Sequence, residues 1–376
     1  MSETDICIIG AGIMGSATAY YLSKITNKQI ILVDQYNVAN DYCSSNDINR
    51  VFRYAYGKDE FYTRLAIQSR KLWQQLEQET NLQLLIPSDL LLVQGTDKEW
   101  NMFNEESHKT LQKIGLETED LERKQLEKRY PQFNAERAFT DPYAGILLAS
   151  KALLTFASEA KKHGVKLIEN MRATRITIQN DRPTIEDSNG NRIIAKRLLV
   201  TAGPWSNNFI RKNLVEMTPT RQQLLYFNPQ DTQLYAPPRF PVFFADQFYG
   251  IPAAGTDAVK VSHMGRDTPT DPETAERSID QEEVDACREL LRRFIPKLSN
   301  ARLAMSKVCL YDMTRDKDFV LGHDPEESDI LYGYGFSGHG FKFAPLIGRV
   351  LAQLVLGNEP GIDISRFNPD RNPTAR

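Results

Sequence analysis

Apolar residues near the start of the chain fall into two short uninterrupted runs, at residues 4–10 and 29–34. Such runs, without polar alternation, are typical of strands that are buried on both faces of a parallel sheet. Between them, residues 10–25 indicate a glycine turn that leads into a helix with small residues along one side. The pattern therefore predicts a β–turn–α–β unit within about 30 residues.

The rest of the chain alternates between helical periodicity and short strand-like runs. Helical periodicity is strongest in three stretches, residues 61–79, 150–164 and 281–295. Residues 215–313 otherwise alternate like antiparallel strands, and residues 329–357 return to strand, glycine loop and helix. We therefore expect an α/β plus α+β protein, in which a Rossmann-like domain is interleaved with a β-rich domain.

Both expected domains are discontinuous in sequence. The Rossmann-like domain comprises residues 1–80, 146–214 and 314–367, and the β-rich domain comprises residues 81–145 and 215–313. Residues 368–376 are polar and contain proline, so we expect them to form a loose tail.

The glycines of the first turn have the spacing GxGxxG, formed by Gly10, Gly12 and Gly15. In this motif the first glycine permits a tight turn, the second lets a pyrophosphate approach the backbone, and the third lets the helix pack on the strand. Asp34 ends the second strand about 20 residues later, where a carboxylate accepts hydrogen bonds from ribose hydroxyls. The unit predicts a dinucleotide, and the acid disfavours NADP without separating NAD from FAD.

Three features elsewhere favour FAD over NAD. A strand runs into the small residues Ala202 and Gly203, which allow the backbone to approach a bound group. A second glycine loop, residues 333–342, opens a helix whose positive end can face the polar edge of a flavin. The interleaved β-rich domain is also suited to cover an isoalloxazine ring as a substrate lid.

Composition and charge exclude several classes of protein. The 376 residues carry a net charge of −3, which gives no electrostatic basis for binding nucleic acid or an anionic membrane. No apolar run approaches the ~20 residues that a transmembrane helix needs, and the N-terminus does not resemble a signal peptide. The four cysteines are widely spaced, which argues against disulfides or a zinc site and fits a reducing cytoplasm.

One of these cysteines, Cys309, lies in a strand-like run at residues 306–314. With a period of two, Val308 and Leu310 point to one face, and the thiol shares the other face with Lys307 and Tyr311. A free cysteine is usually a small buried hydrophobe. The alternation leaves open whether this thiol fills space or reacts.

Five stretches of the sequence, in order and spread over nearly the whole chain, resemble the monomeric sarcosine oxidase and N-methyltryptophan oxidase family of FAD-dependent amine oxidases. They are IIGAGIMGSATAYYL, NRVFRYAYG, VTAGPWS, KVCLYDMT and GFSGHGFKFAP. The last two, together with Arg50 and Arg53, are specific to the family, whereas the first alone is not. The resemblance makes the Rossmann-like domain the expected FAD-binding domain and the β-rich domain the expected substrate domain.

The resemblance implies covalent attachment of FAD through a thioether to Cys309, with Lys307 near enough to favour the thiolate. It also places Lys260 beside the flavin, where a fixed cation assists the reduction of O2. Val259 and Val261 take the opposite face of that strand by alternation.

The family pattern further assigns two arginines and a lysine. It places Arg50 against the flavin, and Arg53 and Lys342 against the carboxylate of the substrate, where a guanidinium gives a bidentate grip and an ammonium adds a point charge. The two arginines are three residues apart and would share one face if their turn were helical. Tyr249 and Tyr311 match aromatic positions near the substrate.

The cofactor contacts implied by the same resemblance are more numerous. They are Gly10, Gly12, Ile13, Met14, Gly15, Asp34, Gln35, Ser44, Ser45, Asn49, Arg50, Ala173, Ala202, Gly203, Trp205, Cys309, Gly338, His339, Gly340, Phe341 and Lys342.

Two positions depart from the family pattern. Asn46 stands where sarcosine oxidase has a histidine beside the flavin, and Met264 stands where it has a histidine at the substrate. His263 is adjacent, but strand alternation would turn it away unless a bulge intervenes. These departures bear on the choice of substrate and on tuning of the flavin.

Together these features predict an FAD-dependent oxidase of a secondary amine or N-substituted amino acid, with a primary amino acid as the second choice. Its products would be an imine and hydrogen peroxide, and it would act as a monomer on a small molecule with O2 as co-substrate. Three alternatives stay open: a flavin-dependent amino acid dehydrogenase with another electron acceptor, an NAD-dependent dehydrogenase, and a non-catalytic flavin-binding partner or sensor.

Overall fold

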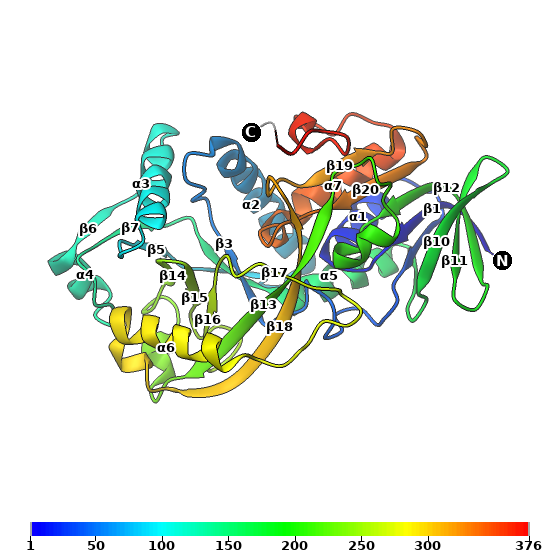
Figure 1. The fold of residues 1–376 in the computed structure, drawn as a ribbon. Coiled ribbons are helices and arrows are strands. Elements are labelled where there is room, and N and C mark those ends of the chain that lie inside the picture. The colour runs from blue at the N-terminus through cyan, green and yellow to red at the C-terminus, as the bar shows by residue number, and fades with distance from the viewer. Residues whose placement is uncertain (1, 375–376) are drawn as a thin grey trace.

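The structure, a computed structural model, describes residues 2–374 and contains two large sheets and one small sheet (Figure 1). The first large sheet has eight strands and a parallel centre in which β1 pairs with both β2 and β12. Its strands are β1 (Ser2–Ile9), β2 (Ile30–Val33), β9 (Lys166–Ile168), β10 (Ala173–Gln179), β11 (Arg182–Asp187), β12 (Arg192–Val200), β19 (Val320–His323) and β20 (Ile330–Tyr334).

Four helices accompany this sheet: α1 (Ile13–Ile25), α2 (Glu60–Thr80), α5 (Ala149–Lys162) and α7 (Ala344–Leu356). The small residues along α1 let neighbouring helices approach closely, and α5 and α7 both pack against it. At the crossing with α7, a Cβ on Gly348 would lie 2.7 Å from the Cβ of Ala17. The β–turn–α–β unit expected from residues 4–34 is therefore present, with its helix buried beneath two others.

The second large sheet has nine strands and forms the core of the other half of the molecule. Its strands are β5 (Leu90–Val93), β6 (Asp120–Glu122), β7 (Arg137–Asp141), β13 (Met217–Asn228), β14 (Val242–Ala245), β15 (Phe248–Ile251), β16 (Val259–His263), β17 (Thr268–Pro269) and β18 (Arg302–Thr314). The pairs within residues 215–313 are antiparallel, as expected, and the parallel pair of β14 with β5 joins them to the earlier segment.

The remaining helices belong to this half or to the connections. The α-helices are α3 (Lys98–Lys113), α4 (Arg123–Arg129) and α6 (Gln281–Phe294), and the 3-10 turns are η1 (Gly203–Asn208), η2 (Thr232–Tyr235), η3 (Pro296–Leu298), η4 (Phe341–Phe343) and η5 (Ser365–Phe367). Helix α6 buries Val284, Leu291 and Phe294 in the second core. Within residues 2–374, no helix combines the length and the apolar character that crossing a membrane requires.

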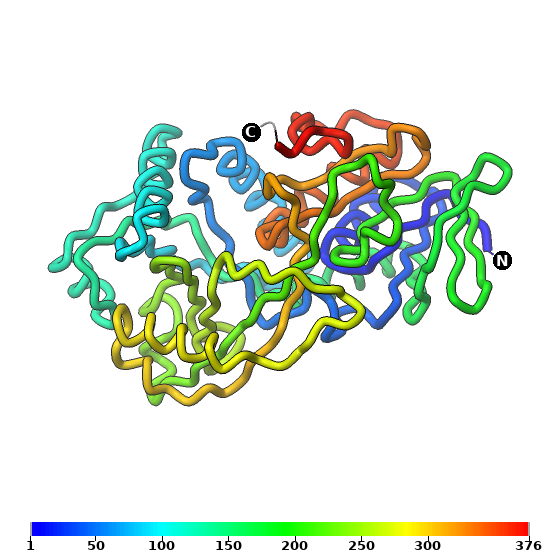
Figure 2. Tube along the Cα trace, viewed as in Figure 1, coloured from blue at the N-terminus to red at the C-terminus, as the bar shows by residue number. Residues whose placement is uncertain are grey.

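The two large sheets take their strands from the two sets of segments that the sequence assigns to the two domains. In Figures 1 and 2 the sheets occupy opposite halves of an elongated molecule, and the long strands β13 and β18 run from one half toward the other. The α/β plus α+β fold class is thereby confirmed. The residue-level domain limits stay a prediction.

A third sheet of three strands, β3 (Asn49–Phe52), β4 (Leu85–Pro87) and β8 (Gly145–Leu148), contains strands from both expected domains. The helical turn considered for Arg50 and Arg53 is wrong, because residues 49–52 pair with β8 as a strand. Arg50 belongs to this strand, whereas Arg53 follows directly after its last residue. This geometry separates the two arginines into different surroundings.

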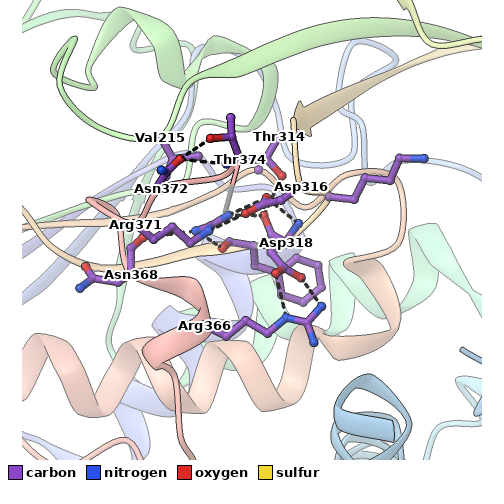
Figure 3. Close-up of polar contacts among 12 residues, drawn as sticks. Val215, Thr314, Asp316, Asp318, Arg366, Asn368, Arg371, Asn372 and Thr374 are labelled. Atoms are coloured by element: carbon purple, nitrogen blue, oxygen red, sulfur yellow. Dashed lines mark hydrogen bonds and ion pairs between the residues drawn. The ribbon is translucent and has the colours of Figure 1, made fainter. Parts of the chain in front are cut away.

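The loose tail expected at residues 368–376 is wrong for its first part, because Arg371 anchors it (Figure 3). The guanidinium donates to both carboxylate oxygens of Asp316, at 2.8 and 3.0 Å, and to the carbonyl oxygen of Phe319 at 2.8 Å. The amide of Val215 also donates to the carbonyl oxygen of Pro369 at 2.9 Å. Residues 375 and 376 lie outside the described residues.

Candidate active site

A cavity of about 450 Å³ lies between the two large sheets and receives side chains from both. Most of the predicted site residues line it: Gly10, Gly12, Ile13, Met14, Asp34, Gln35, Ser44, Ser45, Arg50, Arg53, Ala173, Ala202, Gly203, Trp205, Tyr249, Tyr311, Gly338, His339, Gly340, Phe341 and Lys342. Four others do not line the wall: Gly15, Asn49, Lys260 and Cys309. The structure thus brings together residues from positions 10 to 342 of the chain.

The glycine turn at one end of the cavity has the backbone geometry that the motif predicts. Gly10 has φ +99°, and a Cβ there would collide with the carbonyl oxygen of Thr201. A Cβ on Gly15 would collide with the carbonyl oxygen of Gly10, so this glycine is required for the helix to pack closely. Gly12 faces the cavity, where a Cβ would come no closer than 3.5 Å to Ser45.

Two polar side chains hold the backbone of this turn by hydrogen bonds. The Asp34 carboxylate accepts from the amide of Ala11 at 2.7 Å and from the amide of Tyr36 at 2.9 Å. The Ser45 hydroxyl accepts from the amide of Ile13, the first residue of α1, at 3.1 Å. Burial raises the pKa of Asp34, and these two amide hydrogen bonds oppose that shift. The acid therefore shapes the turn as well as facing the space where a ribose would lie.

Several buried polar atoms of the cavity-lining residues have no hydrogen-bond partner in the described chain. They are Ser44 Oγ, Arg53 Nη1, Trp205 Nε1, His263 Nδ1 and Asp312 Oδ2. Unpaired buried donors and acceptors are costly, so they indicate groups that a ligand satisfies. Together with the glycine cradle at a helix N-terminus, a long cavity lined with such atoms fits FAD.

Arg53 and Lys342 meet at the other end of the cavity through a shared aromatic ring. The guanidinium carbon of Arg53 lies 4.0 Å from the ring centroid of Tyr56, and 5.3 and 5.8 Å from those of Phe244 and Phe103. The Lys342 ammonium donates to the Tyr56 hydroxyl at 2.9 Å and to the His339 carbonyl oxygen at 2.6 Å. Within residues 2–374, neither cation is ion-paired with a carboxylate.

The electrostatics of this end favour the arrival of an anion. Burial lowers the pKa of Arg53, and burial together with the charge of Arg53 lowers the pKa of Lys342 well below its usual value. Burial and the charge of Lys342 likewise lower the pKa of His339. Its Nε2 lies 2.9 Å from the carbonyl oxygen of Lys317, which requires a proton on Nε2. A bound carboxylate would restore the balance of charge.

Cys309 is buried just behind the cavity wall rather than on it. Its Sγ lies 3.6 Å from Nη2 of Arg50 and 3.4 Å from the carbonyl oxygen of Ser44, both of which line the cavity. The ammonium of Lys307, which we expected near the thiol, lies 3.4 Å from Asp41, and Arg50 is the cation that contacts the sulfur. Both faces of this strand are buried here, so alternation alone did not separate core from site.

Lys260 is fully buried and is held by a carboxylate that the sequence analysis missed. Its Nζ donates to Oδ2 of Asp47 at 2.8 Å and to the carbonyl oxygen of Asn49 at 2.5 Å. Asp47 also forms an ion pair with Arg50 and accepts from the hydroxyl of Tyr226. Burial, followed by the charge of Arg50, lowers the pKa of Lys260.

The residues at the family's histidine positions have different surroundings. Met264 lines the cavity, and so does His263, contrary to the expectation that it turns away. His263 is the last residue of β16 and pairs there with Phe248 of β15. Asn46 instead accepts from the Ser150 hydroxyl at 2.6 Å and does not line the cavity. Tyr249 and Tyr311 both line the cavity and interact with each other.

Sequence reasoning missed other contributors besides Asp47. The aromatic residues around Arg53 come from a loop, a helix and a strand: Tyr56, Phe103 and Phe244. Tyr56 lies only three residues after Arg53, so a contact between the two could have been predicted from the sequence. Phe103 and Phe244 are too far away in sequence to be linked to Arg53 without the fold.

Comparison with known proteins agrees with this geometry. The family model described as FAD dependent oxidoreductase matches residues 5–354. The chain is 30% identical to monomeric sarcosine oxidase of Bacillus sp. (strain B-0618), over 98% of this chain and 96% of that protein. It is 26% identical to N-methyl-L-tryptophan oxidase of Salmonella agona (strain SL483), over 98% of each chain.

Among solved structures, glycine oxidase from Geobacillus kaustophilus has the same fold. It superposes with a TM-score of 0.86 at 20% identity, covering 99% of this chain and 100% of that chain. The family match and the full-length relatives lead to one conclusion. This protein belongs to the FAD-dependent oxidoreductase family and resembles monomeric sarcosine oxidase and N-methyl-L-tryptophan oxidase over nearly its whole length.

Proposed function

We propose that this protein is an FAD-dependent oxidase of a secondary amine or N-substituted amino acid, which yields an imine and hydrogen peroxide. The observation that carries the proposal is a pair of buried cations that face the cavity, Arg53 and Lys342, for which residues 2–374 supply no carboxylate partner. The two full-length relatives, named for oxidation of sarcosine and N-methyl-L-tryptophan, support the same class of substrate.

The carboxylate of an amino acid substrate is suited to this end of the cavity. Arg53 offers an unpaired buried Nη1, and Lys342 offers an ammonium already directed by Tyr56 and the His339 carbonyl oxygen. Cation pairs of this kind fix an anion and thereby orient the rest of the molecule. Tyr249, Tyr311 and Met264 line the cavity near the substrate in this proposal.

The bound flavin supplies the two-electron acceptor for oxidation of the C–N bond. The residues proposed to hold it are the glycine turn with Asp34, the small residues 202–203, and the second glycine loop at residues 338–342. Lys260 is proposed to stabilise negative charge that develops on O2 as the enzyme is reoxidised. The imine leaves and is hydrolysed by water.

Cys309 is the proposed site of covalent attachment. Forming a thioether from a thiol and a ring methyl group removes two electrons and two protons, so attachment needs the same terminal oxidant as turnover. The support is the position of Sγ behind the wall, 3.6 Å from the guanidinium of Arg50. The thiolate is the nucleophilic form of a cysteine, and Arg50 is the cation that contacts this sulfur.

The proposal also includes an oligomeric state and a cellular compartment. We infer a monomer that acts in the cytoplasm on small molecules. The name of the relative monomeric sarcosine oxidase supports the first inference, and four free cysteines support the second. Light scattering of the purified protein tests the first, because a stable dimer would double the expected mass.

An anaerobic bleaching screen tests the activity. The purified yellow protein is mixed without O2 with N-methylated amino acids, cyclic imino acids and their decarboxylated analogues. We expect loss of the flavin absorbance with one or more carboxylate-bearing amines, and formation of one peroxide per turnover when air is admitted. Bleaching without peroxide on aeration would instead identify a dehydrogenase that uses another acceptor, and no bleaching by any amine would refute the proposal.

A further inference from the structure

Asp47 is a buried carboxylate surrounded by proton donors from three different elements. Its side chain is 1% exposed, and it contacts Lys260 of β16, Arg50 of β3 and Tyr226 of β13. Its own backbone is fixed, since its carbonyl oxygen accepts from the amide of Ser150 at 2.9 Å. The carboxylate therefore has a defined position relative to all three partners.

Asp47 is the carboxylate that two cations of this cluster share. The side chain of Lys260 is 0% exposed. Its ammonium and the guanidinium of Arg50 both form ion pairs with Oδ2 of Asp47. The charged and titratable groups that face Lys260 are Asp47, Arg50, Tyr226, Cys309 and Lys307. In that set Asp47 is the carboxylic acid, and it contacts both Lys260 and Arg50. Arginine stays protonated under all ordinary conditions. Without the Asp47 carboxylate, the charge of Arg50 would therefore favour loss of the proton from Lys260.

We propose that Asp47 is a positioning residue that keeps Lys260 protonated and fixes its ammonium for reaction of the reduced enzyme with O2. Two of the three N–H groups of Lys260 are engaged, one by Asp47 and one by the carbonyl oxygen of Asn49. The inference rests on the proposed function, in which Lys260 assists O2 reduction. The inference adds that the positive charge of Lys260 depends on Asp47.

The test uses the flavin-loaded enzyme and the substitution Asp47→Asn, which keeps the shape and removes the charge. Reoxidation of the reduced enzyme by O2 and anaerobic reduction by the amine are each followed by stopped flow across a range of pH. We expect reoxidation to slow by about tenfold for each pH unit above the new, lower pKa of Lys260, and to recover as the pH falls. The rate of reduction by the amine should change by less than about twofold.

A double-mutant cycle separates this role from a general structural one. If Asp47 acts through Lys260, then adding Asp47→Asn to Lys260→Met should leave the reoxidation rate of Lys260→Met unchanged. This comparison also serves if Asp47→Asn alone does not fold, because the double variant removes both charges of the pair. Tyr226→Phe removes another hydrogen bond of Asp47 and should leave the pH at which reoxidation slows unchanged.

The contrary outcomes are distinct. A pH-independent reoxidation rate in Asp47→Asn, or a further loss in the double variant, would overturn the proposal. Lys260→Met with normal reoxidation would overturn it as well. A wild-type enzyme whose reduced flavin O2 does not reoxidise would instead refute the oxidase function itself.

Discussion

The guanidinium of Arg53 stacks on the ring of Tyr56 at 4.0 Å, and the hydroxyl of that same ring accepts from Lys342 at 2.9 Å. One tyrosine thus directs both cations that we propose to hold the carboxylate of the substrate. The Tyr56 hydroxyl also lies 3.5 Å from Nδ1 of His339, the nitrogen that carries no proton when Nε2 is protonated. The tyrosine therefore accepts from the lysine and is placed to donate to the histidine.

Removing the hydroxyl of Tyr56 should weaken substrate binding. Tyr56→Phe keeps the ring under Arg53 and removes the acceptor of Lys342, so we expect KM for the amino acid to rise about tenfold, equivalent to about 1.4 kcal/mol. Tyr56→Leu removes the ring too and should raise KM further, because the cation–π contact adds about 1 kcal/mol. Steady-state kinetics with the amino acid and its decarboxylated analogue measure both effects. Equal changes for the two amines would contradict a role in carboxylate binding.

Binding of a carboxylate should depend on pH through Lys342. Burial and Arg53 lower the pKa of this ammonium in the free enzyme, and a bound anion raises it again. Binding therefore takes up a proton, and affinity should fall by about tenfold per pH unit above the lowered pKa. Inhibition by acetate across about pH 6 to 9 measures this effect.

The matched control for that experiment is Lys342→Met. This variant should bind acetate more weakly, and its affinity should no longer follow the pH. A wild-type inhibition constant that is constant over the whole range would show that Lys342 keeps its proton in the free enzyme.

Loss of the Cys309 thiol should release the flavin from its tether without unfolding the protein. In Cys309→Ser, acid precipitation should leave the yellow flavin in solution, whereas the wild-type pellet should keep it. Cys287→Ser is the control, since Cys287 lies on the buried face of α6 in the second core and does not line the cavity. Flavin left wholly in solution from the wild type would show that Cys309 forms no bond to it.

Removing Arg371 should destabilise the fold although it lies near the C-terminus. Its partner Asp316 is 5% exposed, and breaking a buried ion pair costs about 3 kcal/mol. Urea unfolding of Arg371→Ala measures this loss, and Thr374→Ala, which removes an exposed hydrogen bond, is the control. A change below about 0.5 kcal/mol would mean that the tail contributes little.

The same ion pair predicts how stability changes in acid. Burial raises the pKa of Asp316, but the hydrogen bonds and charge of Arg371 outweigh it and lower the pKa overall. A lowered pKa in the folded state means that the stabilisation is complete above about pH 4 and is lost as the pH falls through the folded-state pKa. The difference in unfolding free energy between wild type and Arg371→Ala should therefore shrink in acid.

The sequence by itself determined the parts of this protein that depend on local pattern. The two apolar runs with GxGxxG between them specified strand, turn and helix, because Gly10 and Gly15 occupy positions where any side chain would collide with the backbone. The order of the motifs also indicated the family, and most of the site residues that it implied line the cavity.

The tertiary structure decided which distant residues meet. Asp47 gave no local signal, yet it lies against Lys260, because pairing of β13 with β16 and of β3 with β8 brings their strands around one buried point. The cation that contacts Cys309 is Arg50, which is 259 positions away in sequence, and its neighbour Lys307 contacts Asp41. Buried charges must find partners wherever the chain folds them, and sequence separation does not reveal those partners.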